Sequence, residues 1–338
     1  MVTIRKIAEL CGVSTATVSK ALNHVSGIGA DTAERIRQTA SSLGYLPNAA
    51  ARSLKTRHTH NLGIVTRLRD PSGHSHDFIS RILSAVQGYA EDGGYDITLV
   101  SSQIRGMATN YLDHCRYRNF DGLAIICPDM MSLPVAELVQ SDIPCVCVDC
   151  LNNGQGEVMT DSELCMRELV NYVYSMGHRR IAYIHGENSS FIARARAASF
   201  RKACAAKGLR LPEEYVQAAM FNDFETTRDA TRRLLALPER PTCILFPDDF
   251  AYMGGLYELE ANGLSVPHDI SAVGFDGIYF SQSMRPQLTT YQQDMDGMGR
   301  ETVRLLREMI ESPETYIPQR ILLSGRLLTG GTVAPVEP

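Results

Sequence analysis

The stretch TIRKIAELCGVSTATVSKALN, residues 3–23, decides the fold of the first part of this chain. Apolar residues recur at spacings of three and four over residues 4–11, which is typical of an amphipathic helix, and Thr3 is placed to cap it. Gly12 ends this helix and supplies a turn, and Ser14 can cap the next helix. Two short helices joined by a glycine turn predict a helix-turn-helix.

A third helix is expected to brace the first two. Gly29 is an adequate N-cap for it, and Gly44 ends it. Its apolar positions are Ala33, Ile36, Ala40 and Leu43. The first 46 residues therefore form a small helical head in this prediction.

Charge divides the 338 residues at nearly the same place. Residues 1–60 hold eight Lys and Arg against three Asp and Glu, a net charge of +5, whereas the remainder holds 25 against 35, a net charge of -10. A basic head on an acidic body is typical of a protein that binds nucleic acid. The alternative is an ordinary solvated basic face.

Composition excludes other classes. No apolar run reaches the roughly 18 residues of a membrane span. The first residues lack the apolar core and cleavage site of a signal peptide, and the nine cysteines are an odd number. We therefore expect a cytoplasmic, nucleoid-associated protein with reduced cysteines. Cys145 and Cys147 lie in the strand-like PCVCVD and are expected to face a core, so neither a metal nor a cofactor is predicted.

From Leu62 onward the pattern changes to short apolar runs separated mostly by helix-length segments. The runs are LGIV, YDITLV, DGLAIIC, PCVCVD, RIAYIHG, TCILFP and ISAVGFD. Alternating strand and helix with buried-strand composition predicts parallel sheets in an α/β fold. There are too many units for one open sheet of ordinary size, so two doubly wound subdomains are expected.

The head sequence resembles that of the LacI/GalR (lactose-repressor) family of bacterial transcription regulators. Four further pieces resemble the same family in the same order: LGYLPNAAARSLKT (43–56), GHRRIAYIHG (177–186), ISAVGFD (270–276) and LTTYQQD (288–294). The resemblance covers essentially the whole chain.

This resemblance implies three parts: a DNA-binding head over 1–46, a hinge helix and linker over 47–60, and an effector-binding and dimerisation core over 61–338. The core is expected to resemble periplasmic sugar-binding proteins. Its expected subdomains are about 61–160 with 290–320, and about 161–289 with 321–330.

In a helix-turn-helix, the start of the second helix meets base edges in the major groove. Thr15, Ala16 and Lys20 are placed to do so, although Arg is more usual in the family at Lys20. Short polar side chains around them suit phosphates. The alternative is a capped surface helix. The candidate DNA-contacting residues of the head are Thr3, Ser14, Thr15, Ala16, Thr17, Ser19, Lys20 and Asn23.

The hinge segment AAARSL is about two turns long and marginal as a helix in isolation, so its folding is expected to couple to DNA binding. By resemblance, Leu54 wedges into the minor groove at the operator centre. Arg52 and Lys55 flank it and are expected to contact phosphates. The alternative is that Leu54 packs on the core.

In the core, ligands are expected at the carboxyl ends of the strands. The resemblance places a small-molecule effector, a sugar, sugar acid or related metabolite, between the subdomains. Arg196 is expected to grip hydroxyls or a carboxylate, and Asp276 to accept from hydroxyls. The candidate effector-binding residues are Phe78, Asp161, Arg196, Phe224, Asp248 and Asp276.

Each of these assignments has a structural alternative. Arg196 and Asp276 could form an ion pair with each other. Asp248, where Asn is more usual, could be only a helix cap. Phe78 and Phe224 could be ordinary core residues.

The loop after the first strand of the core departs from the family pattern. It carries Arg67, Arg69, His74 and His76, and if these cations face the ligand they favour an acidic effector. The pair His74 and His76 is weak as a metal motif.

Three function classes compete. The first is an effector-controlled regulator, expected to be a repressor, that binds a pseudo-palindromic operator as a homodimer. The second is a solute-binding protein with the same core fold. The third, an enzyme, is not expected, because neither a phosphate-binding glycine loop nor a G-x-S-x-G elbow is present. The Gly- and Pro-rich tail after Arg326 has no heptads, which argues against a helical tetramerisation segment.

Overall fold

The computed structural model describes residues 2–22, 25–45, 58–66, 77–101, 103–104, 107–108, 110–127, 132–151 and 155–336. Contacts between residues divide the chain into two units, Met1–Thr59 and His60–Pro338. This boundary agrees with the place where the net charge changes sign. The two units are described separately below, as the head and the core.

The head contains the three helices that the sequence predicts: α1 Ile4–Cys11, α2 Thr15–Leu22 and α3 Ala30–Ser42. Thr3 caps α1 by accepting the backbone N–H of Lys6 at 3.4 Å. Gly12 ends α1 with φ of 64°, a left-handed conformation that glycine adopts without steric cost. Gly29 is the N-cap of α3, as expected.

One small core holds the head together. Ile7, Val18 and Ile36 come from the three different helices and are completely buried. Ala21 is also buried, whereas Leu22 and Leu43 are partly buried at the edge of this cluster. The head therefore has an apolar centre of its own.

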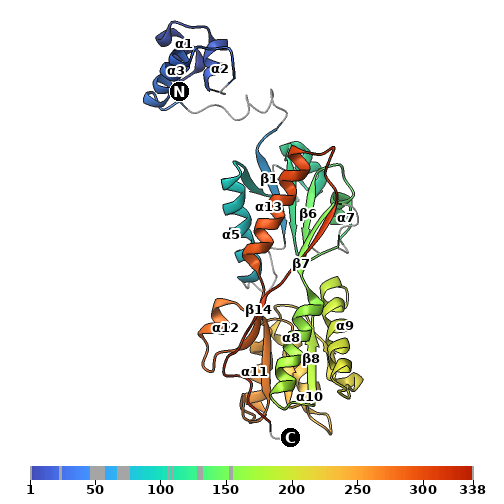
Figure 1. Ribbon diagram of the computed structural model, residues 1–338. Helices are drawn as coiled ribbons and strands as arrows, with labels where there is room; N and C mark the ends of the chain where they lie inside the picture. The colour runs from blue at the N-terminus through green and yellow to red at the C-terminus, as the bar shows by residue number, and fades with distance from the viewer. Residues whose placement is uncertain are drawn as a thin grey trace. The chain divides into compact units, whose positions relative to one another are not determined.

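The core consists of two lobes, each built on a six-stranded sheet (Figure 1). The first lobe has the strand order β13-β7-β6-β5-β1-β2, and all neighbouring strands in it are parallel. Its strands are β1 Asn61–Thr66, β2 Asp96–Leu99, β5 Gly122–Ile126, β6 Cys145–Val148, β7 Gly156–Thr160 and β13 Gln319–Leu323. Beside it, β3 Gln103–Ile104 pairs antiparallel with β4 Met107–Ala108.

Helices cover both faces of the first sheet, as a parallel sheet requires. Ile64 and Val146 face one layer, formed by α5 Asp77–Asp92 and α13 Met295–Glu311. Val65 and Ile125 face the other, formed by α6 Tyr111–Arg118 and α7 Leu133–Val139.

The second lobe has the strand order β14-β12-β11-β10-β8-β9, in which only the pair of β14 with β12 is antiparallel among the described strands. Its strands are β8 Ile181–His185, β9 Val216–Ala218, β10 Cys243–Leu245, β11 Ser271–Asp276, β12 Thr289–Gln292 and β14 Arg326–Leu328. Its helices are α8 Ser162–Ser175, α9 Phe191–Ala206, the 3-10 turn Glu213–Tyr215, α10 Phe224–Leu235, α11 Tyr252–Ala261 and α12 Tyr279–Ser283.

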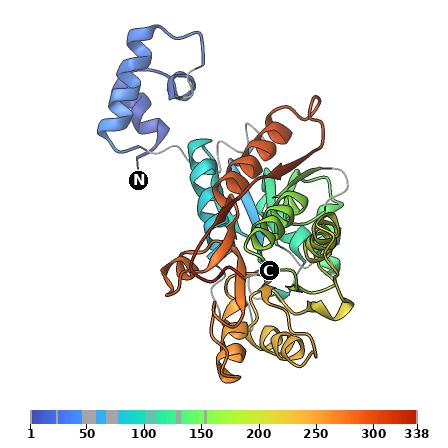
Figure 2. The same ribbon diagram turned by 60° about the horizontal axis from the view of Figure 1, so that its bottom comes forward.

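The second sheet is also covered on both faces (Figure 2). Tyr183 and Phe275 pack in the layer of α8 and α9, whereas Ile184 and Phe246 pack in the layer of α10 and α11. The doubly wound architecture predicted for each subdomain is therefore confirmed.

The chain crosses between the lobes three times. It crosses after β7 at Thr160, between β12 and α13 at Gln293, and between β13 and β14 at Ser324. The last two crossings lie three residues beyond the approximate boundaries expected from the sequence. The expected head and hinge boundary falls among residues that are not described.

All seven apolar runs of the sequence are strands, and the nine cysteines are free thiols, all buried except the half-buried Cys127. The other described strands, β3, β4, β7, β9, β12, β13 and β14, were not predicted. Glu157 of β7 is 4% exposed and pairs with Arg320 of the neighbouring strand β13, so a polar sequence is accommodated inside a sheet.

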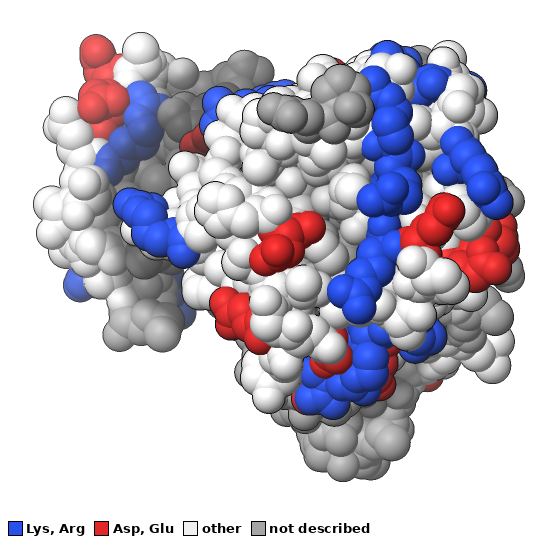
Figure 3. All heavy atoms as spheres, turned by 90° about the horizontal axis from the view of Figure 1, so that it is seen from below, with Lys and Arg blue, Asp and Glu red and all other residues white. Residues whose placement is uncertain are grey.

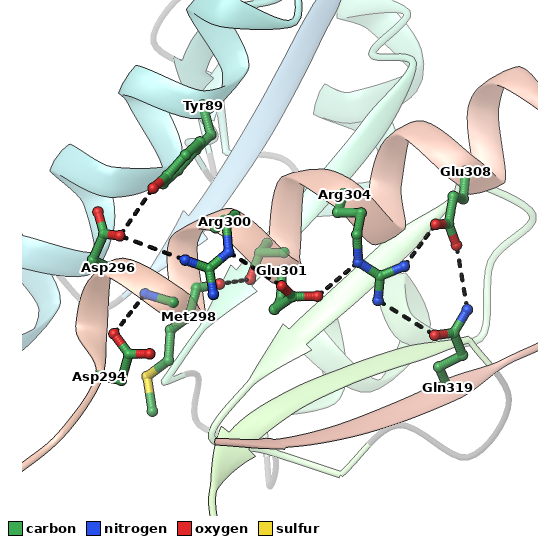
Figure 4. Close-up of polar contacts among 11 residues, drawn as sticks. Tyr89, Asp294, Asp296, Met298, Arg300, Glu301, Arg304, Glu308 and Gln319 are labelled. Carbon is green, nitrogen blue, oxygen red and sulfur yellow. Dashed lines mark hydrogen bonds and ion pairs between the residues drawn. The ribbon is translucent and has the colours of Figure 1, made fainter. Parts of the chain in front are cut away.

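A ladder of charged side chains runs along α13 (Figure 4). Arg304 bonds Glu301 and Glu308, each at 2.6 Å, and Gln319 of β13 joins Glu308 at 3.2 Å. At the other end, Tyr89 of α5 donates to Asp296 at 2.9 Å. These contacts fix α13, the helix that follows the second crossing, against its neighbours in the first lobe.

Candidate functional site

The outer face of α2 presents the residues expected to meet DNA. Thr15, Ala16 and Lys20 are exposed, while Val18 on the opposite face is buried. Because α2 packs against α1 and α3 through this buried face, its remaining surface is available to a partner.

Ser14 caps α2, as expected. Its hydroxyl accepts the backbone N–H of Thr17 at 3.1 Å and bonds the Thr17 hydroxyl at 2.9 Å. Ser14 is exposed, whereas Thr17 and Ser19 are half-buried. The predicted contacts of Asn23, Arg52, Leu54 and Lys55 lie outside the described residues.

In the core, polar side chains from both lobes meet at the carboxyl ends of strands. Cys127 follows β5, Asp149 follows β6, and Asp276 ends β11. All three have positive φ, at 45°, 54° and 106°, as does Asn222 at 54°. Left-handed backbone is costly for residues other than glycine and concentrates at functional sites. We call the group formed by Asp149, Thr160, Arg196, Asp276 and Gln293 the interlobe cluster.

Arg196 is at the centre of this cluster. It projects from α9, is 3% exposed, and lies over the ring of Phe275 at 3.8 Å. Its Nη2 donates to Oε1 of Gln293 at 3.4 Å, and its Nε is buried without a hydrogen-bond partner. A buried guanidinium with an unused donor is a group that a ligand can satisfy.

Asp276 accepts a hydrogen bond from Nε2 of Gln293 at 2.6 Å. Burial raises the pKa of its carboxyl well above the ordinary value, and the nearby Asp248 and Asp249 raise it further, whereas Arg196 and the Gln293 bond oppose this. The carboxyl of Asp276 therefore tends to keep its proton, and hydroxyl donors from a ligand would favour its ionised form.

Asp149 adds a second carboxyl from the first lobe. Its Oδ1 is buried and has no partner. Burial raises its pKa, and the charge of Arg196 lowers it. Thus Arg196 and Asp276 of one lobe lie close enough to Asp149 and Cys127 of the other to act on them electrostatically.

Asp248 and Asp161 both accept hydrogen bonds from backbone N–H groups. Asp248 accepts the N–H of Asn222 on Oδ2 and that of Ala251 on Oδ1, both at 2.7 Å. Asp161 caps α8 by accepting the N–H groups of Glu163 and Leu164 at 3.0 Å. Asp161 is therefore the N-cap of α8 at the first crossing, whereas Asp248 lies in the turn before α11, whose own N-cap is Ala251.

The two aromatic candidates are placed in packing positions. Phe78 is 5% exposed within the first-lobe core. Phe224 is half-buried, with its ring 5.6 Å from that of Tyr257, between α10 and α11. In both cases the alternative of an ordinary packing residue describes the observed surroundings, and no contact with Arg196 is seen for either ring.

Four further residues lie at the site and were not predicted from the sequence: Asp149, Thr160, Phe221 and Gln293. Phe221 lies 5.9 Å from the guanidinium of Arg196 and rests on Gly186, where a side chain would collide with its ring. Asp149 ends the run PCVCVD, so the rule that ligands bind at carboxyl ends could have found it. Gln293 lies inside the motif LTTYQQD but gave no separate signal.

A hollow of about 700 Å³ lies on another side of the crossing, between α5 and the start of α13. Three of its charged groups are already bonded within the protein. Asp296 bonds Tyr89, Asp294 caps α13 through the N–H of Gly297, and Arg326 donates to Gln292 at 2.7 Å. These bonds favour a structural role for this surface.

Among the described residues, no group of three or more His, Cys, Asp and Glu side chains is placed to hold a metal ion. In the same part of the chain, none of the helices is long and apolar enough to cross a membrane.

A helix-turn-helix head joined to a two-lobed α/β core, with polar groups gathered between the lobes, defines a ligand-responsive DNA-binding regulator. Comparisons with known proteins agree. Residues 3–48 match the family described as bacterial regulatory proteins, lacI family, and residues 170–333 match the periplasmic binding protein-like domain.

Relatives match over nearly the whole chain. The PurR transcriptional repressor of Vibrio campbellii is 30% identical over 93% of this chain and 93% of its own length. The ribose operon repressor of Escherichia coli K12 is 30% identical over 98% and 100%. The lac repressor dimer bound to operator and the anti-inducer ONPF has a TM-score of 0.79 at 25% identity, over 98% and 99%.

The chain belongs to the LacI family of bacterial regulatory proteins. It is a DNA-binding transcription regulator with an effector-controlled, periplasmic-binding-protein-like core, and not an enzyme, as the sequence predicted.

Proposed function

We propose that this protein is a cytoplasmic, nucleoid-associated repressor that binds a pseudo-palindromic operator as a homodimer through the exposed face of α2. A sugar-like effector binds at the interlobe cluster and changes operator affinity by changing how the lobes meet. The names of the relatives, which include a ribose operon repressor, support the class of the effector.

One observation carries the effector site. Two buried polar atoms without partners lie near one another where the lobes meet, Nε of Arg196 and Oδ1 of Asp149. Oγ1 of Thr66, which ends β1, and Nδ2 of Asn222, which follows β9, also have none. Buried polar groups are nearly always hydrogen-bonded, so a set of unsatisfied donors and acceptors at one place suits a ligand that supplies both. The hydroxyls of a sugar do so. Since the cluster is buried, the lobes must separate to admit the ligand.

The charge of the described cluster favours a neutral effector. Asp149 and Asp276 contribute two carboxyls, and Asp248 and Asp249 lie near Asp276, against the single cation of Arg196. The acidic-effector hypothesis rests on Arg67, Arg69, His74 and His76, which are outside the described residues. Paired neutral and acidic sugars, D-ribose with D-ribonate and D-glucose with D-gluconate, distinguish the two in a thermal-shift and calorimetric screen.

The functional test combines that screen with selection of operator fragments from genomic DNA. We expect one sugar to raise the unfolding temperature and to change operator affinity. Arg196→Met should abolish both effects of that sugar, because it removes the donors and keeps the length of the side chain.

Arg194→Met is the matched control. Arg194 is exposed on the same helix and bonds only the backbone carbonyls of Asn188 and Ser189. It should leave both responses unchanged. Sugar binding without any selected DNA would instead support the solute-binding alternative, and equal responses in both variants would remove Arg196 from the site.

A further inference from the structure

Gln293 occupies an unusual position in the second crossing between the lobes. Its side chain is 4% exposed and bonds three partners. Oε1 accepts from the hydroxyl of Thr160 and from Nη2 of Arg196 at 3.4 Å, while Nε2 donates to Oδ1 of Asp276 at 2.6 Å. One amide therefore joins the first crossing, helix α9 and the end of β11.

The chemistry of the partners fixes the direction of this amide. Arg196 can only donate, so the oxygen of Gln293 must face it. Asp276 accepts from the opposite end of the amide, which must then be the nitrogen. The amide of Gln293 thus offers an acceptor to the cation and a donor to the carboxyl at once.

Arg196 is a cation, Asp276 is an anion when it is ionised, and both bond Gln293, yet they do not pair. Within the described part of the chain, no carboxylate oxygen lies within ion-pair distance of Arg196. A direct pair would be the usual outcome for such groups in a buried setting. Here the amide of Gln293 lies between them and leaves Nε of Arg196 unsatisfied.

We propose that Gln293 is a positioning residue of the effector site, which keeps Arg196 and Asp276 from forming an ion pair and ties both to the first crossing at Thr160. The proposal rests on the proposed function of these two residues in effector binding. By separating them, Gln293 leaves one donor of the cation and one oxygen of the carboxyl for a ligand.

The bond to Thr160 gives this arrangement a second consequence. Thr160 ends β7 of the first lobe, whereas Arg196 and Asp276 belong to the second. A ligand that pulls on Arg196 or Asp276 therefore acts through Gln293 on both crossings. The crossings connect the two lobes, so they are the segments that hinge when the lobe arrangement changes.

The test measures thermal unfolding of the full chain against pH and needs no effector. In Gln293→Ala, space opens between Arg196 and Asp276, and we expect them to pair. The carboxyl of Asp276, which faces Asp248, Asp249 and Arg196, then ionises more readily. Its native state binds fewer protons than that of the wild type, so the variant gains stability relative to the wild type as pH rises.

The expected result is a stability deficit of Gln293→Ala that shrinks by about 3 °C or more between pH 5 and pH 8. If Gln293 only supplied a hydrogen bond to Asp276, its loss would raise the pKa of that carboxyl further, and the deficit would grow with pH. A deficit that grows or stays constant overturns the proposal. Gln293→Ser, which also opens space, replaces the alanine variant if that variant does not fold.

Three controls make the assignment specific. Gln292→Ala removes the neighbouring amide, which bonds Arg326 and the carbonyl of Gly277, and its deficit should not depend on pH. In an Asp276→Asn background, the pH-dependent part of the Gln293→Ala effect should disappear. A crystal structure of Gln293→Ala should show Arg196 within 4.0 Å of Asp276, and its absence there would count against the spacer role.

Failure of this test leaves the effector site itself standing, because the sugar screen with Arg196→Met decides that question separately. If both succeed, Gln293→Ala should also weaken binding of whichever sugar the screen selects by about ten-fold or more, since pairing consumes the groups that bind it.

Discussion

At the scale of single residues, the most perturbed described carboxyl with a defined role in packing is Asp249. It is completely buried and follows Asp248 in the loop after β10. Oδ2 accepts from the N–H of Ile278 at 3.0 Å and the hydroxyl of Ser281 at 2.6 Å, and Oδ1 accepts from Thr290 at 2.6 Å. It thus fixes the start of α12 to the second sheet.

Burial raises the pKa of Asp249 to about 7, although its three hydrogen bonds oppose the shift. An unfolded aspartate titrates near 3.9, so the native state holds a proton that the unfolded state has lost. The stabilisation is complete below the unfolded pKa and is lost as pH rises through about 7. We predict that the unfolding temperature of Asp249→Asn rises relative to the wild type by about 3 °C or more between pH 5.5 and 8.5.

Asp142→Asn is the control for this measurement, because the side chain of Asp142 is 85% exposed and pairs only with Arg116. Its difference from the wild type should be flat over the same range. A flat difference for Asp249→Asn as well would show that Asp249 is ionised throughout, and that the hydrogen bonds outweigh burial.

Residue chemistry explains which site residues the sequence could predict. Arg196 and Asp276 follow buried strands or belong to motifs, and their charge marks them, so both were found. Asp248 was also selected because it follows a buried strand, but each of its carboxylate oxygens already accepts a backbone N–H group. Gln293 is neutral and lies in a crossing. Its importance comes from partners as far as 133 residues away in sequence, which no local pattern encodes.

At the scale of elements, the cap of α2 separates stability from DNA binding. Ser14 caps the helix and was also predicted to contact phosphate. Ser14→Ala should destabilise the head by about 1 kcal/mol, as loss of an N-cap usually does, and should weaken operator binding. Ser14→Asp should keep the cap, because Asp is an equally good N-cap residue, but should bind operator worse than the alanine variant through repulsion of phosphate.

Unfolding of both variants, followed by circular dichroism and compared with fluorescence anisotropy on operator DNA, tests this pair of effects. Wild-type operator affinity in Ser14→Asp would mean that Ser14 lies away from the phosphates and acts only as a cap.

The strands also show which elements a local sequence pattern cannot predict. The seven strongly apolar runs became strands because parallel strands covered by helices on both faces need continuous apolar sequence. Strand β13, QRILL, lies at the edge of its sheet with alternating exposure, and β7 contains a buried glutamate. The polar residues of each strand are explained only by the other strand, because Arg320 of β13 neutralises Glu157 of β7. Such tertiary partners are absent from any local window.

At the scale of the whole molecule, the two units have net charges of opposite sign. The head carries +5 and the core -10. The face in Figure 3 shows that basic side chains still gather locally, in a stripe with acidic groups beside it. Many basic side chains of the core are paired, as Arg201 is with Glu213 at 2.7 Å. The acidity of the core is therefore a net property and not a uniform field.

This division predicts where the salt dependence of operator binding resides. Charges separated by more than about 10 Å are largely screened at 0.1 M salt, so only groups at the DNA contribute to counterion release. Lys20 is exposed on α2, whereas Lys207 is exposed at the end of α9 in the core. Lys20→Gln should weaken operator binding about ten-fold and reduce the slope of log affinity against log salt by about 1. Lys207→Gln removes the same charge from a more acidic unit and should change neither quantity. A reduced slope in Lys207→Gln would place the core within reach of the phosphates, and the separation of roles between the two units would then be wrong.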